Sequence, residues 1–182
     1  MDVTAVYVHP KFNKTLANKR ITGCLSEVST LHFGVDNITP LPINTDRYFP
    51  FLGQRTEALG WGATNIGGDS YDNGTYPDVP QITTLRMNNN YDCERYWPLK
   101  KNTRDNVGCV LGVSMPVGYR TAVCVGDSGG PVVAYGKMWG ITSFGPTNCG
   151  DMNAPAVVTR VSSVAPWICK TLEKVNAEAH KH

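Results

Sequence analysis

A serine in a glycine-rich loop is the feature of this sequence with the clearest chemistry. The segment reads Cys124-Val125-Gly126-Asp127-Ser128-Gly129-Gly130-Pro131. A serine hydroxyl is a weak nucleophile until a base removes its proton and hydrogen-bond donors stabilise the oxyanion that forms. Ser128 supplies the hydroxyl, and the backbone N–H groups of Gly126 and Ser128 can point at the oxyanion. Because Gly126 has no Cβ, a substrate carbonyl can approach the backbone there. The loop itself contains no base.

The elements that must position this loop are expected to be β-strands. Short apolar runs alternate with turn residues along the chain, a pattern typical of an all-β barrel or sandwich. The expected strands are Thr4–Val8, Arg55–Leu59, Gln81–Arg86, Asn106–Gly112, Pro131–Tyr135, Lys137–Ser143 and Ala156–Arg160. Tyr135-Gly136-Lys137 predicts a tight hairpin turn between two of them. The stretch Ala63–Pro77 is rich in Gly, Asn, Asp and Tyr and predicts an exposed loop.

One helix is expected, at the C-terminal end of the sequence. Ser163 can cap it, and Pro166 is tolerated in a first turn. Apolar residues recur at helical spacing and predict a face that docks on the barrel. These residues are Ala165, Ile168, Leu172 and Val175. We expect the tail Ala177–His182 to be frayed.

Composition excludes several classes of protein. The chain has 182 residues, of which 41% are hydrophobic and 18% charged, so it can bury a core. A formal net charge of +2 is too small to indicate nucleic-acid binding. No apolar run reaches the roughly 18 residues that span a membrane. No cofactor motif is found, and no cysteine pair has the close spacing typical of a metal site.

Cysteines and glycosylation motifs indicate an oxidising compartment. The chain has six cysteines, an even number that favours disulfides. Asn13, Asn37 and Asn73 each begin an N-x-[ST] motif and are candidate glycosylation sites of a secreted protein. Met1–Val8, however, alternates like a strand and lacks the features of a secretory leader. We therefore expect the sequence to be incomplete at its start, the alternative being a cytosolic protein with free thiols.

These features together resemble the chymotrypsin/trypsin family of serine proteases. The family's landmarks occur in order: the Ser128 loop is preceded by His9-Pro10-Lys11-Phe12, Val35–Ile43 and Gly60-Trp61-Gly62, and followed by Ser143-Phe144-Gly145 and Trp167-Ile168. The resemblance implies an all-β, trypsin-like double β-barrel with an incomplete first barrel and a C-terminal α-helix. Within one domain over 1–178, residues 1–50 would be the remnant of the first barrel, 51–162 the second barrel and 163–178 the helix.

The resemblance also implies how the cysteines pair. It pairs Cys93 with Cys109, which clips a loop, and Cys124 with Cys149, which ties the serine loop to a pocket wall. Cys24 and Cys169 remain. They can pair with each other, or Cys24 can pair with a segment missing from the start.

A substrate pocket follows from the same resemblance. Its base would be Ala122, where a preference for Lys or Arg substrates requires an aspartate. Gly145 and Ala156 would line its walls, beside Ser143 and Phe144. The methyl group of Ala156 should narrow the pocket, and Val158 suggests that it is apolar. We expect a small or medium apolar side chain to bind there.

The catalytic base is the missing part. The family places a histidine roughly 140 residues before the serine and an aspartate roughly 90 before it. The histidine would then fall before Met1, and His9, His32, His180 and His182 lack its context. Asp36 has a suitable spacing for the aspartate, but the sequence context instead puts Lys19 or Arg20 near that position. A cation there would oppose the imidazolium that forms during the reaction.

Asp127 raises a further difficulty. In the family this carboxylate pairs with the ammonium of a newly cleaved N-terminus, which Met1-Asp2-Val3-Thr4 does not resemble. We expect an unpaired carboxylate, a rearranged loop and a poorly formed oxyanion hole in this chain.

Two functions remain open at this point. The first is a secreted serine endopeptidase, inactive in this form, that acts on polypeptides. The second is a non-catalytic pseudoprotease that binds a protein as an inhibitor or adaptor. For either we expect a monomer without a cofactor, metal, nucleic-acid or membrane partner.

Overall fold

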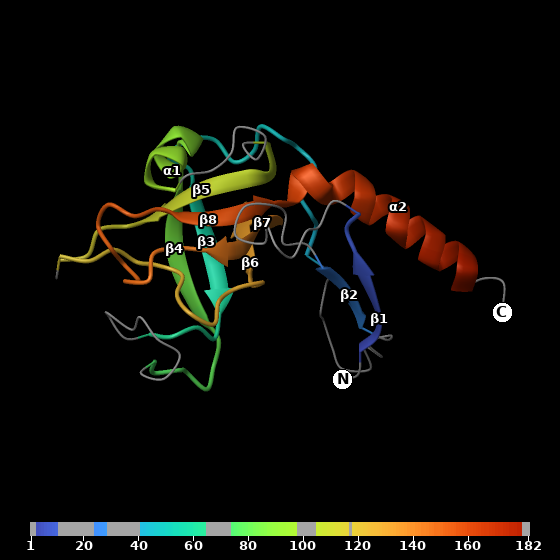
Figure 1. The fold of residues 1–182 in the computed structure, drawn as a ribbon, viewed down its shortest axis with the longest axis horizontal. Coiled ribbons are helices and arrows are strands. Elements are labelled where there is room, and N and C mark those ends of the chain that lie inside the picture. The colour runs from blue at the N-terminus through green and yellow to red at the C-terminus, as the bar shows by residue number, and fades with distance from the viewer. Residues whose placement is uncertain are drawn as a thin grey trace.

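The structure, a computed structural model, describes residues 3–10, 24–28, 41–64, 74–97, 105–116 and 118–179, with only the backbone of residues 3–5 and 24–28. A closed barrel dominates it, with a helix and a two-stranded sheet to one side (Figure 1). The strands are β1 Val3–Val8, β2 Cys24–Val28, β3 Arg55–Gly60, β4 Gln81–Asn88, β5 Val107–Gly112, β6 Pro131–Ala134, β7 Lys137–Phe144 and β8 Ala156–Arg160. The helices are α1 Asn90–Tyr96 and α2 Val161–Ala179.

The barrel is antiparallel and runs in the order β3-β4-β5-β8-β7-β6. It closes where Glu57 and Ala58 of β3 pair with Val133 and Val132 of β6. Its core is a cluster of fully buried side chains that includes Leu85, Val110, Val132, Trp139 and Val158. Successive side chains of a strand point to opposite faces, so alternate residues such as Ala156 and Val158 of β8 face this core.

The seven expected strands are all present, with ends that differ by at most two residues. The hairpin between β6 and β7 also forms as expected. Ala134 pairs with Lys137, and the two loop residues have positive φ angles, 48° at Tyr135 and 69° at Gly136. Two positive φ angles define the type I′ turn, whose twist matches that of the flanking strands.

Two elements were not predicted. Strand β2 pairs antiparallel with β1 and forms a separate two-stranded sheet. Helix α1 has no apolar stripe, since only Cys93 of its residues is buried, so periodicity could not reveal it. Its signals are local. Asn89 caps it by accepting a hydrogen bond from the Tyr91 N–H, and Asp92 and Arg95 suit its first and last turns.

Helix α2 begins earlier and docks over a shorter length than expected. It starts at Val161, directly after β8, so Ser163 lies within its first turn and its Oγ donates to the Arg160 carbonyl (2.6 Å) instead of capping the helix. Val161, Val164 and Ile168 pack in an apolar cluster at the barrel's end. Leu172, expected on the docking face, is 50% exposed.

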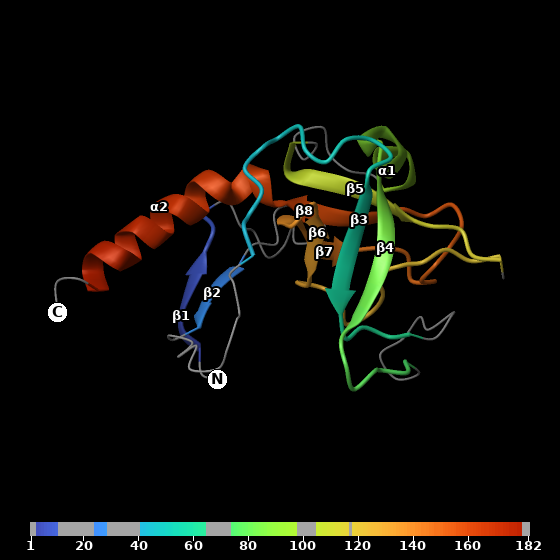
Figure 2. The same cartoon turned by 180° about the vertical axis from the view of Figure 1, so that it is seen from behind.

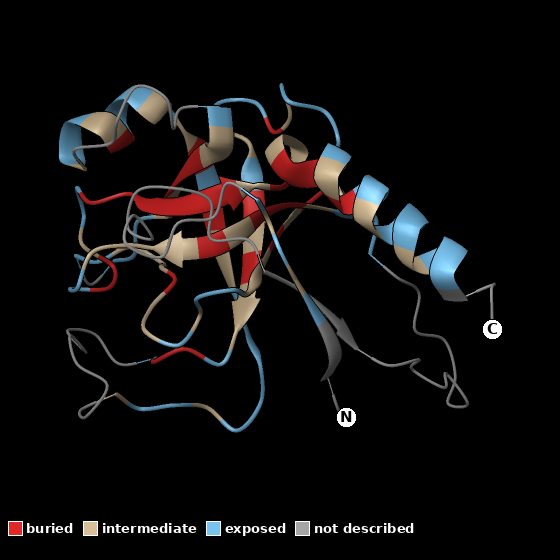
Figure 3. Ribbon diagram, turned by 45° about the vertical axis from the view of Figure 1, so that its right-hand side comes forward, coloured by how far each residue is buried: buried red, intermediate tan, exposed pale blue. Residues whose placement is uncertain are grey.

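The far half of α2 therefore points away from the barrel, as Figures 1 and 3 show. The helix continues to Ala179, so the prediction of fraying from Ala177 is wrong for the residues that the structure describes.

The described segment before β3, residues 41–54, is hydrogen-bonded to the barrel. The Asn44 N–H donates to the Met138 carbonyl, and the Met138 N–H donates to the Pro42 carbonyl (2.8 Å each). Arg160 reaches the same segment, and its Nη1 donates to the carbonyls of Arg47 (3.0 Å) and Phe49 (3.3 Å). Burial lowers the pKa of Arg160 from its ordinary value, while nearby Asp105 and Asp46 act in the opposite direction. Figure 2 shows the segment 41–54 from behind, in cyan, leading into β3.

Candidate active site

Ser128 lies exposed in the loop between β5 and β6. Two consecutive turns shape this loop. The Asp127 N–H donates to the Cys124 carbonyl (3.0 Å), and the Gly130 N–H donates to the Asp127 carbonyl (2.9 Å). Gly126 and Gly129 have φ angles of +100° and +86°, a region that disfavours any residue with a Cβ. The glycines of the motif are therefore required by the backbone path that presents Ser128.

The loop is held from outside as well. The Gly129 N–H donates to the Thr142 carbonyl (2.8 Å), and the Thr142 N–H donates to the Gly130 carbonyl (2.9 Å). A disulfide between Cys124 and Cys149, with Cα atoms 5.4 Å apart, ties the start of the loop to the segment after β7. These bonds fix the backbone on both sides of Ser128.

The carboxylate of Asp127 is paired, contrary to expectation. Oδ1 accepts a hydrogen bond from the Gly62 N–H (2.8 Å), and Oδ2 accepts one from the Cys124 N–H (2.9 Å). A Cβ on Gly60 or Gly62 would lie only 2.0 or 2.4 Å from Asp127 side-chain atoms. The two glycines of Gly60-Trp61-Gly62 thus make room for the carboxylate. Sequence reasoning considered only a cationic partner and missed these backbone donors, which satisfy a carboxylate without one.

The two expected oxyanion donors are available. Among the described residues, neither the Gly126 N–H nor the Ser128 N–H has a hydrogen-bond partner. The N–H groups of Asp127, Gly129 and Gly130 are, by contrast, hydrogen-bonded to backbone carbonyls. Since Asp127 is paired, the reason for expecting a rearranged loop is removed.

The residues expected to form a substrate pocket come together in part. Ala122 and Ala156 line the same small cavity, about 10 Å³, with Pro146, Gly150 and Ala154. A Cβ placed on Gly145 would lie 3.3 Å from the Ala156 Cβ, so these two residues face each other closely. Val158 does not line this cavity. It is fully buried in the barrel core, where the pleat of β8 directs it, and the expectation that it shapes the pocket is not supported.

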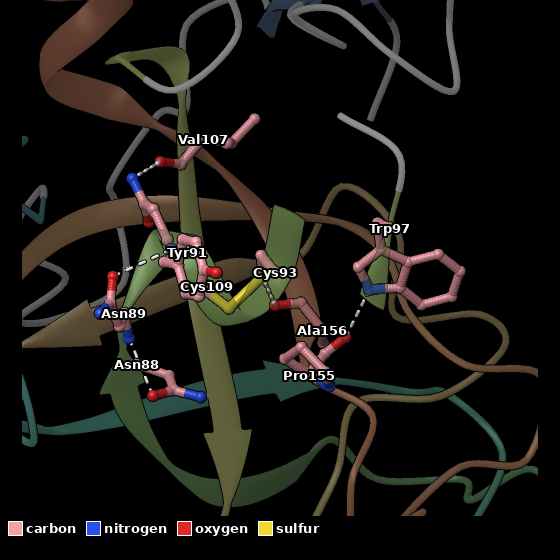
Figure 4. Close-up of a disulfide and its surroundings, with 10 residues drawn as sticks. Asn88, Asn89, Tyr91, Cys93, Trp97, Val107, Cys109, Pro155 and Ala156 are labelled. Carbon is pink, nitrogen blue, oxygen red and sulfur yellow. Dashed lines mark hydrogen bonds between the residues drawn. A yellow bond between two sulfur atoms is a disulfide. The ribbon is translucent and has the colours of Figure 1, made fainter. Parts of the chain in front are cut away.

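Ser143 and Phe144 form the end of β7 beside this region, and Phe144 is supported by a residue that sequence reasoning missed. Trp97 lies just after α1 and makes an edge contact with the Phe144 ring, with centroids 5.4 Å apart. Its Nε1 donates to the Pro155 carbonyl (2.9 Å), next to Ala156 (Figure 4). No sequence signal was available for this contact, because it joins three segments that are distant in the chain.

Figure 4 also shows the disulfide that holds α1 in place. Cys93 of α1 is bonded to Cys109 of β5, as the resemblance implied. The third expected pair is not formed, because Cys169 is a free thiol exposed on α2. Cys169 lies on the exposed face of α2, and the side chain of Cys24 lies outside the described residues.

Most residues considered for the base and for its aspartate partner lie outside the described part of the chain; these are His32, His180 and His182 for the base and Asp36 for the aspartate. The cation expected near the aspartate position, Lys19 or Arg20, and the candidate glycosylation sites Asn13, Asn37 and Asn73 also lie there. His9 is described, and its ring stacks edge-on against Trp167 of α2, with centroids 4.9 Å apart. Within the described ranges no cluster of His, Cys, Asp and Glu could hold a metal ion. Neither described helix is long and apolar enough to cross a membrane.

Ser128 thus lies in a loop of a closed antiparallel barrel, and the backbone N–H groups of Gly126 and of Ser128 itself have no partner among the described residues. The family model described as Trypsin matches residues 1–168, and the chain belongs to this family. It is 33% identical to Kallikrein-1 of Mus musculus over 179 residues, covering 93% of this chain and 64% of that protein. It is 31% identical to glandular kallikrein of Sus scrofa, covering 93% and 68%.

Comparison with solved structures agrees on the fold. The structure of neuropsin, a serine protease expressed in the limbic system of mouse brain, superposes with a TM-score of 0.75 at 24% identity. The match covers 93% of this chain and 70% of neuropsin. The all-β, trypsin-like architecture with a C-terminal helix is thereby confirmed, whereas the chain spans less than two thirds of the length of Kallikrein-1.

Proposed function

We propose that this chain is part of a secreted serine endopeptidase in which Ser128 is the nucleophile. The observation that carries the proposal is the state of the serine loop. The N–H groups of Asp127, Gly129 and Gly130 are hydrogen-bonded, whereas those of Gly126 and Ser128 have no partner among the described residues and lie beside the exposed Ser128 side chain. A preorganised pair of backbone donors next to the nucleophile is what an oxyanion requires.

The proposed reaction is acyl transfer to serine followed by hydrolysis. A general base removes the Ser128 proton while Oγ attacks the carbonyl carbon, and the negative charge develops on the oxygen held by the two N–H groups. The protonated base then gives its proton to the leaving amine, and water hydrolyses the acyl-serine by the reverse sequence. His9 stacks on Trp167 of α2, so we propose that the base comes from outside the described residues.

The substrate class follows from the pocket residues. Ala122 offers no carboxylate for a Lys or Arg side chain, and the close approach of Ala156 to Gly145 narrows the space between these two residues. We therefore propose polypeptides with a small apolar residue before the scissile bond. Disulfides, and sequons at Asn13, Asn37 and Asn73, support a secreted glycoprotein, which we propose to be a monomer without nucleic-acid partners.

A pseudoprotease is the second candidate function. The observation that favours it is the cation at Lys19 or Arg20, near the position where the resemblance requires an aspartate. A histidine without that carboxylate would lack its orienting partner, and an inherited serine loop would then serve only as scaffold. In this case the chain would bind a protein as an inhibitor or adaptor.

Labelling with a fluorophosphonate probe separates the two functions, because the probe reacts only with an activated serine. The naturally produced protein is first characterised by N-terminal sequencing and intact mass. It is then compared with Ser128→Ala and with Ser114→Ala, which alters an exposed serine of another loop. The peptidase proposal expects labelling of the natural protein and of Ser114→Ala, and none of Ser128→Ala. A correctly folded natural protein that resists labelling would overturn the peptidase and favour the pseudoprotease.

A further inference from the structure

Arg120 joins two segments that wall the candidate pocket. Its backbone N–H donates to the Gly150 carbonyl (2.9 Å), and its Nε donates to the Met152 carbonyl (2.8 Å). Its Nη1 donates to the carbonyl of Gly112, at the end of β5 (2.8 Å). One residue therefore connects the segment 119–123, which contains Ala122, both to the segment 149–154 and to the barrel.

These bonds lie next to the pocket residues. Arg120 is two positions before Ala122, and it lines the same small cavity as Gly150, Ala154 and Ala156. A shift of segment 119–123 relative to segment 149–154 would therefore change the width of the pocket directly. Arg120 is half-buried and does not need to touch a substrate to have this effect.

Two glycines allow the segments to approach so closely. A Cβ on Gly150 would lie 2.7 Å from the Arg120 carbonyl oxygen, and the φ of Gly150 is +83°. A Cβ on Gly112 would lie only 1.5 Å from the Thr121 carbonyl oxygen. Segment 119–123 is thus enclosed between two backbones at distances that only glycine permits.

The chemistry of the guanidinium suits this role. Among the described residues its hydrogen bonds go to carbonyl oxygens and none to a carboxylate. A planar fork with fixed donor directions holds two carbonyls at a set separation, whereas a lysine ammonium is a single flexible point. The Cys124–Cys149 disulfide joins the residue just after segment 119–123 to the first residue of segment 149–154, and this one covalent bond does not fix the spacing of the two segments further along.

We propose that Arg120 is a positioning residue that sets the width of the substrate pocket, and so selects for small side chains before the scissile bond. The selection rests on the proposed peptidase function. The clamp itself, which is the fixed spacing of segments 119–123 and 149–154, does not.

The first experiment measures selectivity in the naturally processed protein. Two peptide substrates differ only in Ala or Leu before the scissile bond, and the ratio of their kcat/KM values is determined. In Arg120→Gln this ratio is expected to shift toward Leu by about tenfold, the size of effect that a change of pocket fit produces. Arg120→Lys should shift it less, because it can still satisfy one carbonyl. Arg86→Gln is the matched control. Arg86 also donates to a backbone carbonyl, that of Gly53 (3.1 Å), but it does not line the cavity that contains Ala122.

A merely structural role would lower both kcat/KM values equally and leave their ratio unchanged. An unchanged ratio in folded Arg120→Gln therefore overturns the proposal. If that variant does not fold, the ratio in Arg120→Lys decides in the same way.

The second experiment does not require catalysis. Hydrogen exchange is measured by mass spectrometry on peptides covering segments 119–123 and 149–154. In the Arg120 variants both segments are expected to exchange about tenfold faster, while β7 keeps its protection. Unchanged exchange overturns the clamp. If the wild-type protein hydrolyses neither peptide and resists the fluorophosphonate, the peptidase function fails, and faster exchange would still uphold the clamp.

Discussion

The barrel and the β1–β2 sheet are both antiparallel, yet they differ in how many neighbours each strand has and in how deeply its side chains are buried. Every barrel strand has two neighbours, and the barrel encloses Trp139, Leu85 and Val110 at 0–1% exposure. Strands β1 and β2 have one neighbour each within the described part, and Val6 and Val8 are 58% and 52% exposed. Closure removes edges and creates an interior, whereas a lone hairpin can do neither.

The difference explains where the site lies. Ser128, Asp127, Ala122 and Ala156 all lie on the barrel or on loops anchored to it, where hydrogen bonds and a disulfide hold the backbone. A catalytic constellation needs side chains held by rigid elements, and the closed barrel provides them. The β1–β2 sheet adds His9, whose contact with Trp167 connects it to α2.

The largest effect on stability is expected from shortening a buried side chain of the barrel, compared with shortening an exposed side chain of β1. Trp139→Ala should lower the free energy of unfolding by about 3–5 kcal/mol, because a fully buried indole is replaced by a cavity. Val8→Ala, on exposed β1, should change it by less than about 0.5 kcal/mol. Urea denaturation followed by far-UV circular dichroism measures both. Similar losses from the two variants would show that the barrel does not dominate stability.

A smaller effect is expected from removing the disulfide that joins α1 to β5. Replacing Cys93 and Cys109 together with serine should cost about 3 kcal/mol, since the bond closes a loop with a sequence separation of 16 residues. Cys169→Ser, at the free exposed thiol, is the control and should leave the midpoint of denaturation unchanged. A double variant as stable as the control would mean that α1 and Trp97 are held by packing alone.

The smallest effect concerns the cap of α1. Asn89→Ala removes the side-chain oxygen that accepts from the Tyr91 N–H (2.9 Å), and about 1 kcal/mol should be lost. Asn148→Ala, at an exposed loop position, is the comparison variant. Thermal denaturation should rank the two. If Asn89→Ala unfolds at the same temperature as Asn148→Ala, the disulfide rather than the cap defines where α1 begins.

The strands of the barrel could be predicted because each is a short apolar run bounded by turn residues, which is a local signal. The Tyr135-Gly136 turn was predictable for the same local reason, as two residues must supply the positive φ angles. Helix α1 was missed because it is anchored by Cys93 alone, without an apolar stripe. The start of α2 was misplaced because Val161 packs in the apolar cluster at the barrel's end, so the helix begins there, two residues before the expected cap at Ser163.

The sequence by itself determined which loop presents Ser128, because the glycines around it are local requirements of one backbone path. It also determined the strand order along the chain and the two disulfides that the family resemblance implied. Only the tertiary structure decided that backbone N–H groups of Gly62 and Cys124 satisfy Asp127. The same holds for the contacts of Trp97 and Arg120 with the pocket walls. These contacts join residues far apart in the chain, and no local pattern encodes which carbonyl or amide a fold brings within 3 Å of a side chain.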